Sequence, residues 1–326
     1  MYDISRRRFV VGATTATSVF GLGKSIEFMP SAWAQAAAGD RQNPRGLTHY
    51  RFNLGDVEIT QIFDGEVLTP PNPNFIHNAT VDDTKAALRA ANLPDDAIPS
   101  SYTVTIAKIG GKYVMFDSGN PPSSQPRTGR LLANMKAAGI DKTDISTIVI
   151  THFHGDHIFG LYGEGNNQAW PNIEIVMPAA EYDFWTDPSK TAPLPEGRQG
   201  LAKRIQATFP TWKNIRRFSG EAEVMPNVKA VSTPGHSFGH TSYLIASGAQ
   251  QYLVVGDVAH VTQLFVRNPG WHLSFDQDPK EAEATRRKVL DRIIADKMMA
   301  GGYHWGMPGC GTLAKDGNSY VFSPRA

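Results

Sequence analysis

The sequence feature that most constrains this chain is the stretch 148–157, IVITHFHGDH, in which an apolar segment runs directly into three histidines and one aspartate. Its first four residues are apolar or β-branched and predict a buried strand. His152 and His154 alternate with a phenylalanine, so their side chains project to the same side, whereas Asp156 and His157 lie beyond a glycine-containing turn. Imidazole nitrogen and carboxylate oxygen are ligands for zinc and similar divalent metals. Because the chain has only ten histidines, three within six residues indicate a metal site rather than a polar loop.

Three later segments contain residues of the same chemistry. The sequence TPGH places His236 in a turn, and a second apolar strand, 252–256, runs directly into Asp257. The alternative for Asp257 is a simple turn-forming role. His304 lies near the C-terminus in the segment GYHWGMPG. A lone histidine so far along the chain is ordinarily a pocket or core residue, but its glycine-rich, proline-containing surroundings favour a metal ligand.

The composition excludes some function classes. A formal net charge of +1 provides no electrostatic basis for binding nucleic acid or an acidic membrane surface. The single cysteine, Cys310, excludes an intramolecular disulfide and indicates that the metal site is built from histidine and aspartate. We expect Cys310 itself to be a small buried residue and not a ligand.

The N-terminus is predicted to be a targeting segment, residues 1–34. The sequence SRRRFV is similar to a twin-arginine signal, a weakly apolar run follows over 9–22, and AWA fits a cleavage site before Gln35. The run is too short, and too rich in glycine and threonine, for stable membrane insertion. A signal for the ordinary secretory route is the alternative, and either route leads to the periplasm. The twin-arginine export machinery, a predicted partner of the precursor, transports folded proteins and would suit a chain that acquires its metal before export.

The organisation of the remaining chain favours one domain. Residues 35–45 are small and polar and are predicted to be a linker, and residues 46–326 a single domain. Apolar and polar residues alternate around glycine-containing turns, which predicts β-hairpins over 50–68 and 101–117. The proline-rich segment 70–100 is predicted to run over the surface, where it could cover a cleft.

Segments predicted to form helices lie between the predicted strands. Residues 127–138 are predicted to form a helix that ends before Gly139, and residues 280–299 a long amphipathic helix. Residues 186–200 contain three prolines and two glycines and are predicted to be loop. Strands and helices thus recur twice, with the candidate metal ligands at strand ends in both halves.

The combined motif set resembles the metallo-β-lactamase superfamily. The order is His-x-His-x-Asp-His, Thr-Pro-Gly-His, Gly-Asp and a late histidine, and the resemblance covers nearly all of the chain after residue 45. It implies an α/β fold, a four-layer αββα sandwich with the metal site at the shared edge of its two sheets. Within the superfamily, the stretches 50–60, 129–139 and 183–185 are similar to the methyl parathion hydrolase branch, which includes lactonase-like members.

The resemblance also implies two divalent metal ions, with zinc expected and manganese, iron or cobalt as alternatives. Carrying the family pattern over by matching motif, the first metal takes His152, His154 and His236, the second takes Asp156, His157 and His304, and Asp257 bridges both. A hydroxide held between the metals would be the nucleophile, which makes Asp257 a catalytic residue as well. His240 shares the turn of His236, but the family pattern implies a structural role for it.

Two residues argue against particular branches of the family. Familiar zinc β-lactamases lack a bridging carboxylate at the position of Asp257, which disfavours β-lactam cleavage. The di-iron redox branch usually carries glutamate at the position of His154, which disfavours electron transfer.

Three residues are candidates for the substrate pocket: Trp185, His260 and Phe275. His260 lies three residues after Asp257, where an apolar residue would be less surprising. The alternatives are plain core positions for Trp185 and Phe275, and a supporting role behind the metal ligands for His260.

The sequence therefore predicts a periplasmic dinuclear metal-dependent hydrolase whose small substrate is a lactone, a carboxylic ester or a phosphotriester. The alternative is a metal-dependent thioester hydrolase or an iron oxygenase of the same fold. A non-catalytic binding protein is disfavoured because all seven ligands are intact. Nucleic acid is not an expected partner, since relatives that process it carry a further domain, and association into a homodimer is left open.

Overall fold

The computed structural model describes residues 40–326. The predicted signal segment 1–34 and the first part of the predicted linker lie outside the described residues. Where that linker enters them, the backbone N–H groups of Arg41 and Gln42 each donate to the carboxylate of Glu66 at 2.7 Å. Gln42 and Asn43 are buried, so this part of the segment packs as part of the domain.

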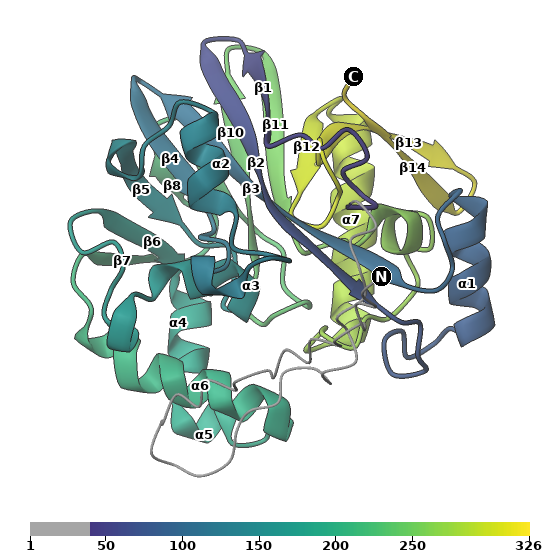
Figure 1. Ribbon diagram of the computed structural model, residues 1–326, viewed down its shortest axis with the longest axis horizontal. Helices are drawn as coiled ribbons and strands as arrows, with labels where there is room; N and C mark the ends of the chain where they lie inside the picture. Colours follow the sequence, from purple (N-terminus) through teal and green to yellow (C-terminus); the bar gives the residue numbers. More distant parts are fainter. Residues whose placement is uncertain (1–39) are drawn as a thin grey trace, which may run out of the picture. The chain divides into compact units, whose positions relative to one another are not determined.

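The first of two seven-stranded sheets is formed by the N-terminal half of the described residues (Figure 1). Its strands follow chain order: β1 (His49–Leu54), β2 (Val57–Thr69), β3 (Ile98–Ile109), β4 (Lys112–Phe116), β5 (Ile145–Val149), β6 (Glu174–Pro178) and β7 (Ile215–Phe218). The pairs from β1 to β4 are antiparallel and those from β4 to β7 are parallel. The two predicted hairpins are therefore present.

The second sheet is formed by the C-terminal half, in reversed order. Its strands are β14 (Ser319–Pro324), β13 (Cys310–Asp316), β12 (Met299–Gly302), β11 (Gln250–Gly256), β10 (Thr241–Ser247), β9 (Val228–Ser232) and β8 (Glu223–Met225). Only β11 and β12 pair in parallel, which brings their C-terminal ends to the same edge.

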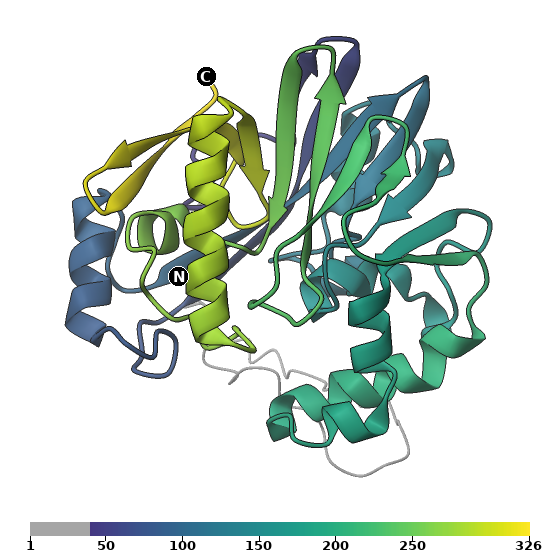
Figure 2. The same ribbon diagram turned by 180° about the vertical axis from the view of Figure 1, so that it is seen from behind.

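Helices cover the outer face of each sheet (Figures 1 and 2). The covering helices are α1 (Val81–Ala90), α2 (Leu131–Ala137), α4 (Ala179–Trp185), α6 (Glu196–Thr208) and α7 (Pro279–Ala295). Two short helices lie elsewhere: α3 (Gly155–Ile158) contains the candidate ligands Asp156 and His157, and α5 (Pro188–Thr191) packs against α4 and α6. One core cluster packs α2, α4 and α6 against the first sheet, and a second packs α1 and α7 against the other. A third cluster lies between the sheets. This arrangement confirms the predicted αββα sandwich.

Strand β11 shows how the sequence builds these layers. Leu253 and Val255 belong to the cluster under α7, whereas Tyr252 and Val254 belong to the cluster between the sheets. Successive side chains of a strand point to opposite faces, so an uninterrupted apolar run fits a strand that is covered on both sides. Each such side chain contributes roughly 1.5–3 kcal/mol when fully buried.

Three predicted helix boundaries were wrong. The helix predicted from residue 127 begins at Leu131, because Gly129 has a φ of +81° and the Leu131 N–H is capped by the carboxylate of Asp64. The predicted loop 186–200 contains α5 and the start of α6, since Pro188 begins α5 and Pro195 is the N-cap of α6, and proline is tolerated at helix N-termini. Helix α7 ends at Ala295, and residues 299–302 form β12.

Among residues 40–326, no helix is both long enough and apolar enough to cross a membrane.

Candidate metal centre

The candidate ligands lie at the ends of strands from both sheets. Strand β5 leads into residues 152–157, β11 leads into Asp257, and β12 ends two residues before His304. His236 lies in the turn between β9 and β10. The sheets are joined beside the site, because the Thr241 N–H donates to the Thr151 carbonyl at 3.0 Å. The fold thus gathers residues that are more than 150 positions apart in the sequence.

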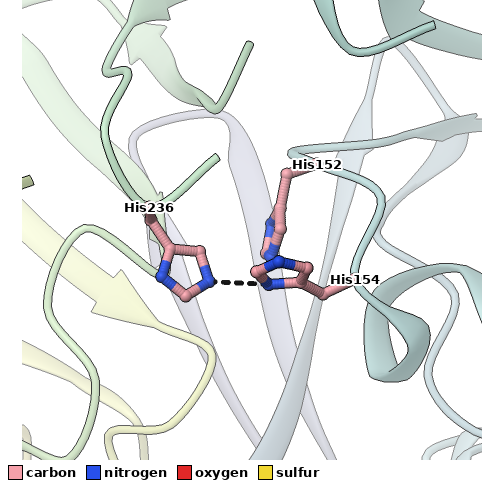
Figure 3. A group of neighbouring side chains, drawn as sticks. All are labelled: His152, His154 and His236. Carbon is pink, nitrogen blue, oxygen red and sulfur yellow. Dashed lines mark hydrogen bonds between the residues drawn. The ribbon is translucent and has the colours of Figure 1, made fainter. Parts of the chain in front are cut away.

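The first group consists of His152, His154 and His236, whose candidate ligand atoms all lie within 4.8 Å of one another (Figure 3). The Nδ1 atom of His154 faces the Nε2 atom of His236 at 2.9 Å. The His236 Nδ1–H donates to Asp276, which leaves Nε2 with a lone pair in the neutral ring. The Nε2 atom of His152 is buried and has no hydrogen-bond partner.

The second group consists of Asp156, His157, Asp257 and His304, also within 4.8 Å. The Asp257 Oδ2 atom lies 3.0 Å from His304 Nε2 and 3.4 Å from His157 Nε2. The same oxygen lies 3.3 Å from His236 Nε2 in the first group. Asp257 therefore occupies the position between the two groups that a bridging ligand requires.

Outer hydrogen bonds orient the histidine rings. The His157 Nδ1–H donates to Asp117 at 2.8 Å, and the His304 Nδ1–H donates to the Ser101 carbonyl at 2.8 Å. The Thr151 hydroxyl donates to Asp117, so its oxygen can accept the Nδ1–H of His152 at 3.0 Å. Partners of this kind fix the tautomer and turn the Nε2 lone pair inward, which strengthens metal binding.

These outer partners were not predicted from the sequence. Asp117 directly follows strand β4, as Asp257 follows β11, and this parallel could have identified it. Asp276, the partner of His236, lies in a loop with no comparable pattern. Ser101 contributes a backbone carbonyl, which no pattern of side chains can reveal.

The carboxylates and imidazoles strongly perturb one another's pKa values. Burial opposes the charged form of His157, but Asp156, Asp257 and Asp117 outweigh it and raise its pKa well above the usual value. Burial likewise opposes ionisation of Asp257, but the surrounding histidines hold its pKa well below the usual range. Burial lowers the pKa of His236, yet its bonds to two aspartates raise it to about 9.

The residues present fit two divalent cations. His152 Nε2, His157 Nε2 and Asp257 Oδ1 are buried without hydrogen-bond partners, and the candidate ligand atoms of each group lie within 4.8 Å of one another. Nitrogen and oxygen donors in sets of three or four, sharing one carboxylate, match the preferences of zinc-like metals.

His240 is not among these groups. Its Nε2 atom accepts the N–H of Asp257 at 3.0 Å, and its Nδ1 contacts the Thr233 hydroxyl at 2.8 Å. Burial, and then the neighbouring His236, lowers its pKa to about 3, so the ring is neutral. Gly256 lies against this ring with a φ of +63°, and a Cβ there would be 2.6 Å from Nε2. His240 therefore has the structural role that the sequence suggested, holding the backbone of Asp257.

Trp185 lies in the core and does not line an open pocket. Its side chain is 0% exposed, and its indole N–H donates to Glu181 at 2.8 Å. The indole packs edge-on behind His154, with ring centroids 6.3 Å apart. Trp185 is the last residue of α4 and packs in the same core cluster as Ala202 and Ile205 of α6, so the alternative of a core position holds.

His260 and Phe275 are connected to the second group of ligands. The His260 ring stacks on His304 with centroids 3.9 Å apart, and its buried Nδ1 atom has no hydrogen-bond partner. Phe75 packs edge-on against both His260, at 6.3 Å, and Phe275, at 6.0 Å. The Phe275 side chain is 48% exposed, so a row of aromatic rings leads from the surface to His304. A pocket role for His260 and Phe275 stays a prediction.

A second row of aromatic rings leads to the first group. Phe238 is 47% exposed, and its ring packs 4.8 Å from that of Phe184. The Phe184 ring in turn packs edge-on against that of Trp185, with centroids 5.6 Å apart, and the Trp185 ring packs edge-on against His154. A row of packed aromatic rings thus runs from each group of ligands to the surface. Cys310 takes no part in either, since it is buried between the sheets as predicted.

Comparisons with known proteins agree with this geometry. The model of the metallo-beta-lactamase superfamily matches residues 94–296. An N-acyl homoserine lactonase of a Bacillus species is 27% identical over 153 residues, 47% of this chain and 52% of that protein. The chain thus matches about half the length of these curated relatives.

Two solved structures are similar over most of their length. The dizinc quorum-quenching lactonase AidC, in complex with a product, has a TM-score of 0.77 and 25% identity, covering 85% of this chain and 97% of AidC. The hydrolase AbOPH of the beta lactamase superfamily has a TM-score of 0.79 and 26% identity, covering 86% and 98%.

Proposed function

The chain belongs to the metallo-β-lactamase superfamily, and from this premise we propose that it is a metal-dependent hydrolase that opens lactones carrying an apolar acyl group. The observation that carries the proposal is the pair of ligand groups that share Asp257, in a fold similar to that of a dizinc lactonase. The curated relatives named as N-acyl homoserine lactonases support the same substrate class.

We assign the first metal position to His152, His154 and His236, and the second to Asp156, His157 and His304, with Asp257 shared. Zinc is the proposed metal, because the donors are imidazole and carboxylate and the similar structure is dizinc. Bound cations would lower the pKa of water and polarise the ester carbonyl under attack.

The chain's own residues preorganise this centre. His240 accepts the backbone N–H of Asp257 and so steadies the backbone from which the shared carboxylate projects. Asp117 orients His157 directly and His152 through Thr151. Preorganised groups avoid the cost of reorienting during the reaction.

The aromatic rows supply the apolar part of substrate recognition. Phe275 and Phe238 are exposed at the outer end of each row, whereas the inner rings contact the metal ligands. An acyl chain that lies along the row that begins at Phe275 would be shielded from water while its ester group lies at the metals. The favourable free energy is about 0.8 kcal/mol for each buried methylene.

We also propose that the protein acts in the periplasm after export by the twin-arginine route. This proposal is supported by the SRRRFV sequence and the small-residue cleavage site before Gln35. Lactones with acyl chains that pass between cells would meet an exported enzyme there.

A substrate screen tests the proposed activity. The purified, zinc-loaded chain is assayed against N-acyl homoserine lactones, aryl carboxylic esters, phosphotriesters and thioesters, with the Asp257→Ala variant as the blank. We expect the highest kcat/KM on lactones and a large loss of that activity in the variant. A higher kcat/KM on phosphotriesters or esters would show that lactones are not the preferred substrates. Oxygen consumption by the iron-loaded protein would refute the proposal that the enzyme is a hydrolase.

A further inference from the structure

The guanidinium of Arg286 is buried in the outer layer of the fold, away from the ligand groups. Arg286 lies on α7 and is 1% exposed. A buried cation is costly unless its donors are all satisfied. Here Nε donates to the Val258 carbonyl at 2.9 Å, and Nη1 donates to the carbonyls of Pro269 and Trp271, each at 2.8 Å. Nη2 donates to the Asp276 carboxylate at 3.3 Å.

One branch of this network reaches the first ligand group. Asp276 accepts the Arg286 guanidinium on Oδ2 and the His236 Nδ1–H on Oδ1, the latter at 2.8 Å. The carboxylate is itself buried, so its orientation is set by these two partners and by the Leu273 N–H at 3.3 Å. Arg286 therefore holds the group that aims the His236 ring.

The other branch reaches the shared ligand. Val258 directly follows Asp257, and its carbonyl is held by Arg286 Nε. The N–H of Asp257 is held on the opposite side by His240. The peptide that precedes Asp257 is thus held by the imidazole of His240, and the peptide that follows Val258 is held by the guanidinium of Arg286.

We infer that Arg286 is a positioning residue that sets His236 and Asp257 relative to each other, and so keeps both metal positions intact. The inference rests on the proposed function only for the metal ligation and not for the substrate. Planar geometry is essential here, because the donors of one guanidinium reach four separate oxygens, which the compact ammonium of lysine cannot do. Nothing in the motif set of the ligands identifies this residue.

The test measures metal binding in the chain without any substrate. Variants Arg286→Lys and Arg286→Met are compared with wild type by metal content after dialysis, by competition with a chelator, and by the visible spectrum of the cobalt-loaded protein. We expect both variants to lose at least about tenfold in metal affinity, the usual effect of removing an outer partner, and to show a changed cobalt spectrum. Asp276→Asn is expected to weaken only the site that contains His236.

Two controls separate positioning from stability. Arg287→Met removes the neighbouring guanidinium of α7, which pairs with Glu283 at the surface, and should leave metal binding unchanged. Leu290→Ala removes a fully buried side chain from the same helix without touching the network, and should lower the melting temperature but not the metal affinity.

The outcomes are distinguishable. The inference is overturned if the Arg286→Lys variant folds and binds two metals with the affinity and spectrum of wild type. It is also overturned if Leu290→Ala loses as much metal affinity as the Arg286 variants. If Arg286→Met does not fold, Arg286→Lys and Asp276→Asn decide the question. Wild type that binds no metal refutes the proposed function instead.

Discussion

Replacing Phe275 by alanine is predicted to reduce activity on long acyl chains while sparing short ones. The ring is 48% exposed and ends the aromatic row that leads through Phe75 and His260 to His304. A phenylalanine buries roughly 200 Å² when fully covered, so about 100 Å² of this ring is available to a ligand. At roughly 25 cal/mol per Å², complete coverage by an acyl chain is worth about 2.5 kcal/mol, and half coverage about 1.2 kcal/mol.

These free energies correspond to a decrease of about 8-fold to 70-fold in kcat/KM for a long-chain lactone. A short-chain lactone does not reach the ring and should change less than about twofold. The assay is the ratio of kcat/KM values for long-chain and short-chain lactones, measured for wild type and variant under the same metal loading.

Val321 provides the matched control. It is 40% exposed on β14, which β13 separates from the ligand strand β12, and Val321→Ala should leave the ratio unchanged. An equal loss on both substrates in Phe275→Ala would indicate damage to the metal centre, and no loss on either would remove Phe275 from the pocket. Both results contradict the reasoning.

Three further predictions address the ligands, the thiol and export. Asp257→Ala should lower metal affinity and activity by about a hundredfold or more, since removing even an outer partner of a ligand costs up to about that much. His240→Ala should keep its metals and lose roughly 2 kcal/mol of stability, because the Asp257 N–H loses its partner. Elemental analysis and thermal melts distinguish the two variants. Burial raises the pKa of Cys310 to about 12, so the native thiol stays protonated at pH 8 and should resist a thiol reagent until the chain unfolds. The free energy of unfolding should fall as the pH rises above about 9, because the thiol of the unfolded chain then ionises. Rapid labelling of the native protein would contradict this. Changing Arg6 and Arg7 to lysine should trap the precursor inside the cell with its activity intact, and unchanged export would indicate the ordinary secretory route.

The sequence alone determined the family, the sandwich and the identity of the candidate ligands. His152, His154, Asp156 and His157 lie within six residues, so their chemistry and their place after a strand are local properties of the chain. The hairpins were predictable for the same reason, because alternation and turn residues act between neighbours. Asp257 and His304 were recognisable from their order in the motif set.

Tertiary structure alone decided which groups support those ligands and which aromatic residues reach solvent. Asp276 is 40 residues from His236, and Arg286 is 28 residues from Val258, yet each pair is in hydrogen-bond contact. Such contacts depend on how α7 packs on the second sheet, which no local pattern encodes. Trp185 and Phe275 were equal pocket candidates by residue type, but the first is buried in the core cluster of the first sheet and the second is exposed. Burial is a property of the elements packed around a side chain and not of the side chain itself, so it follows only from the assembled fold.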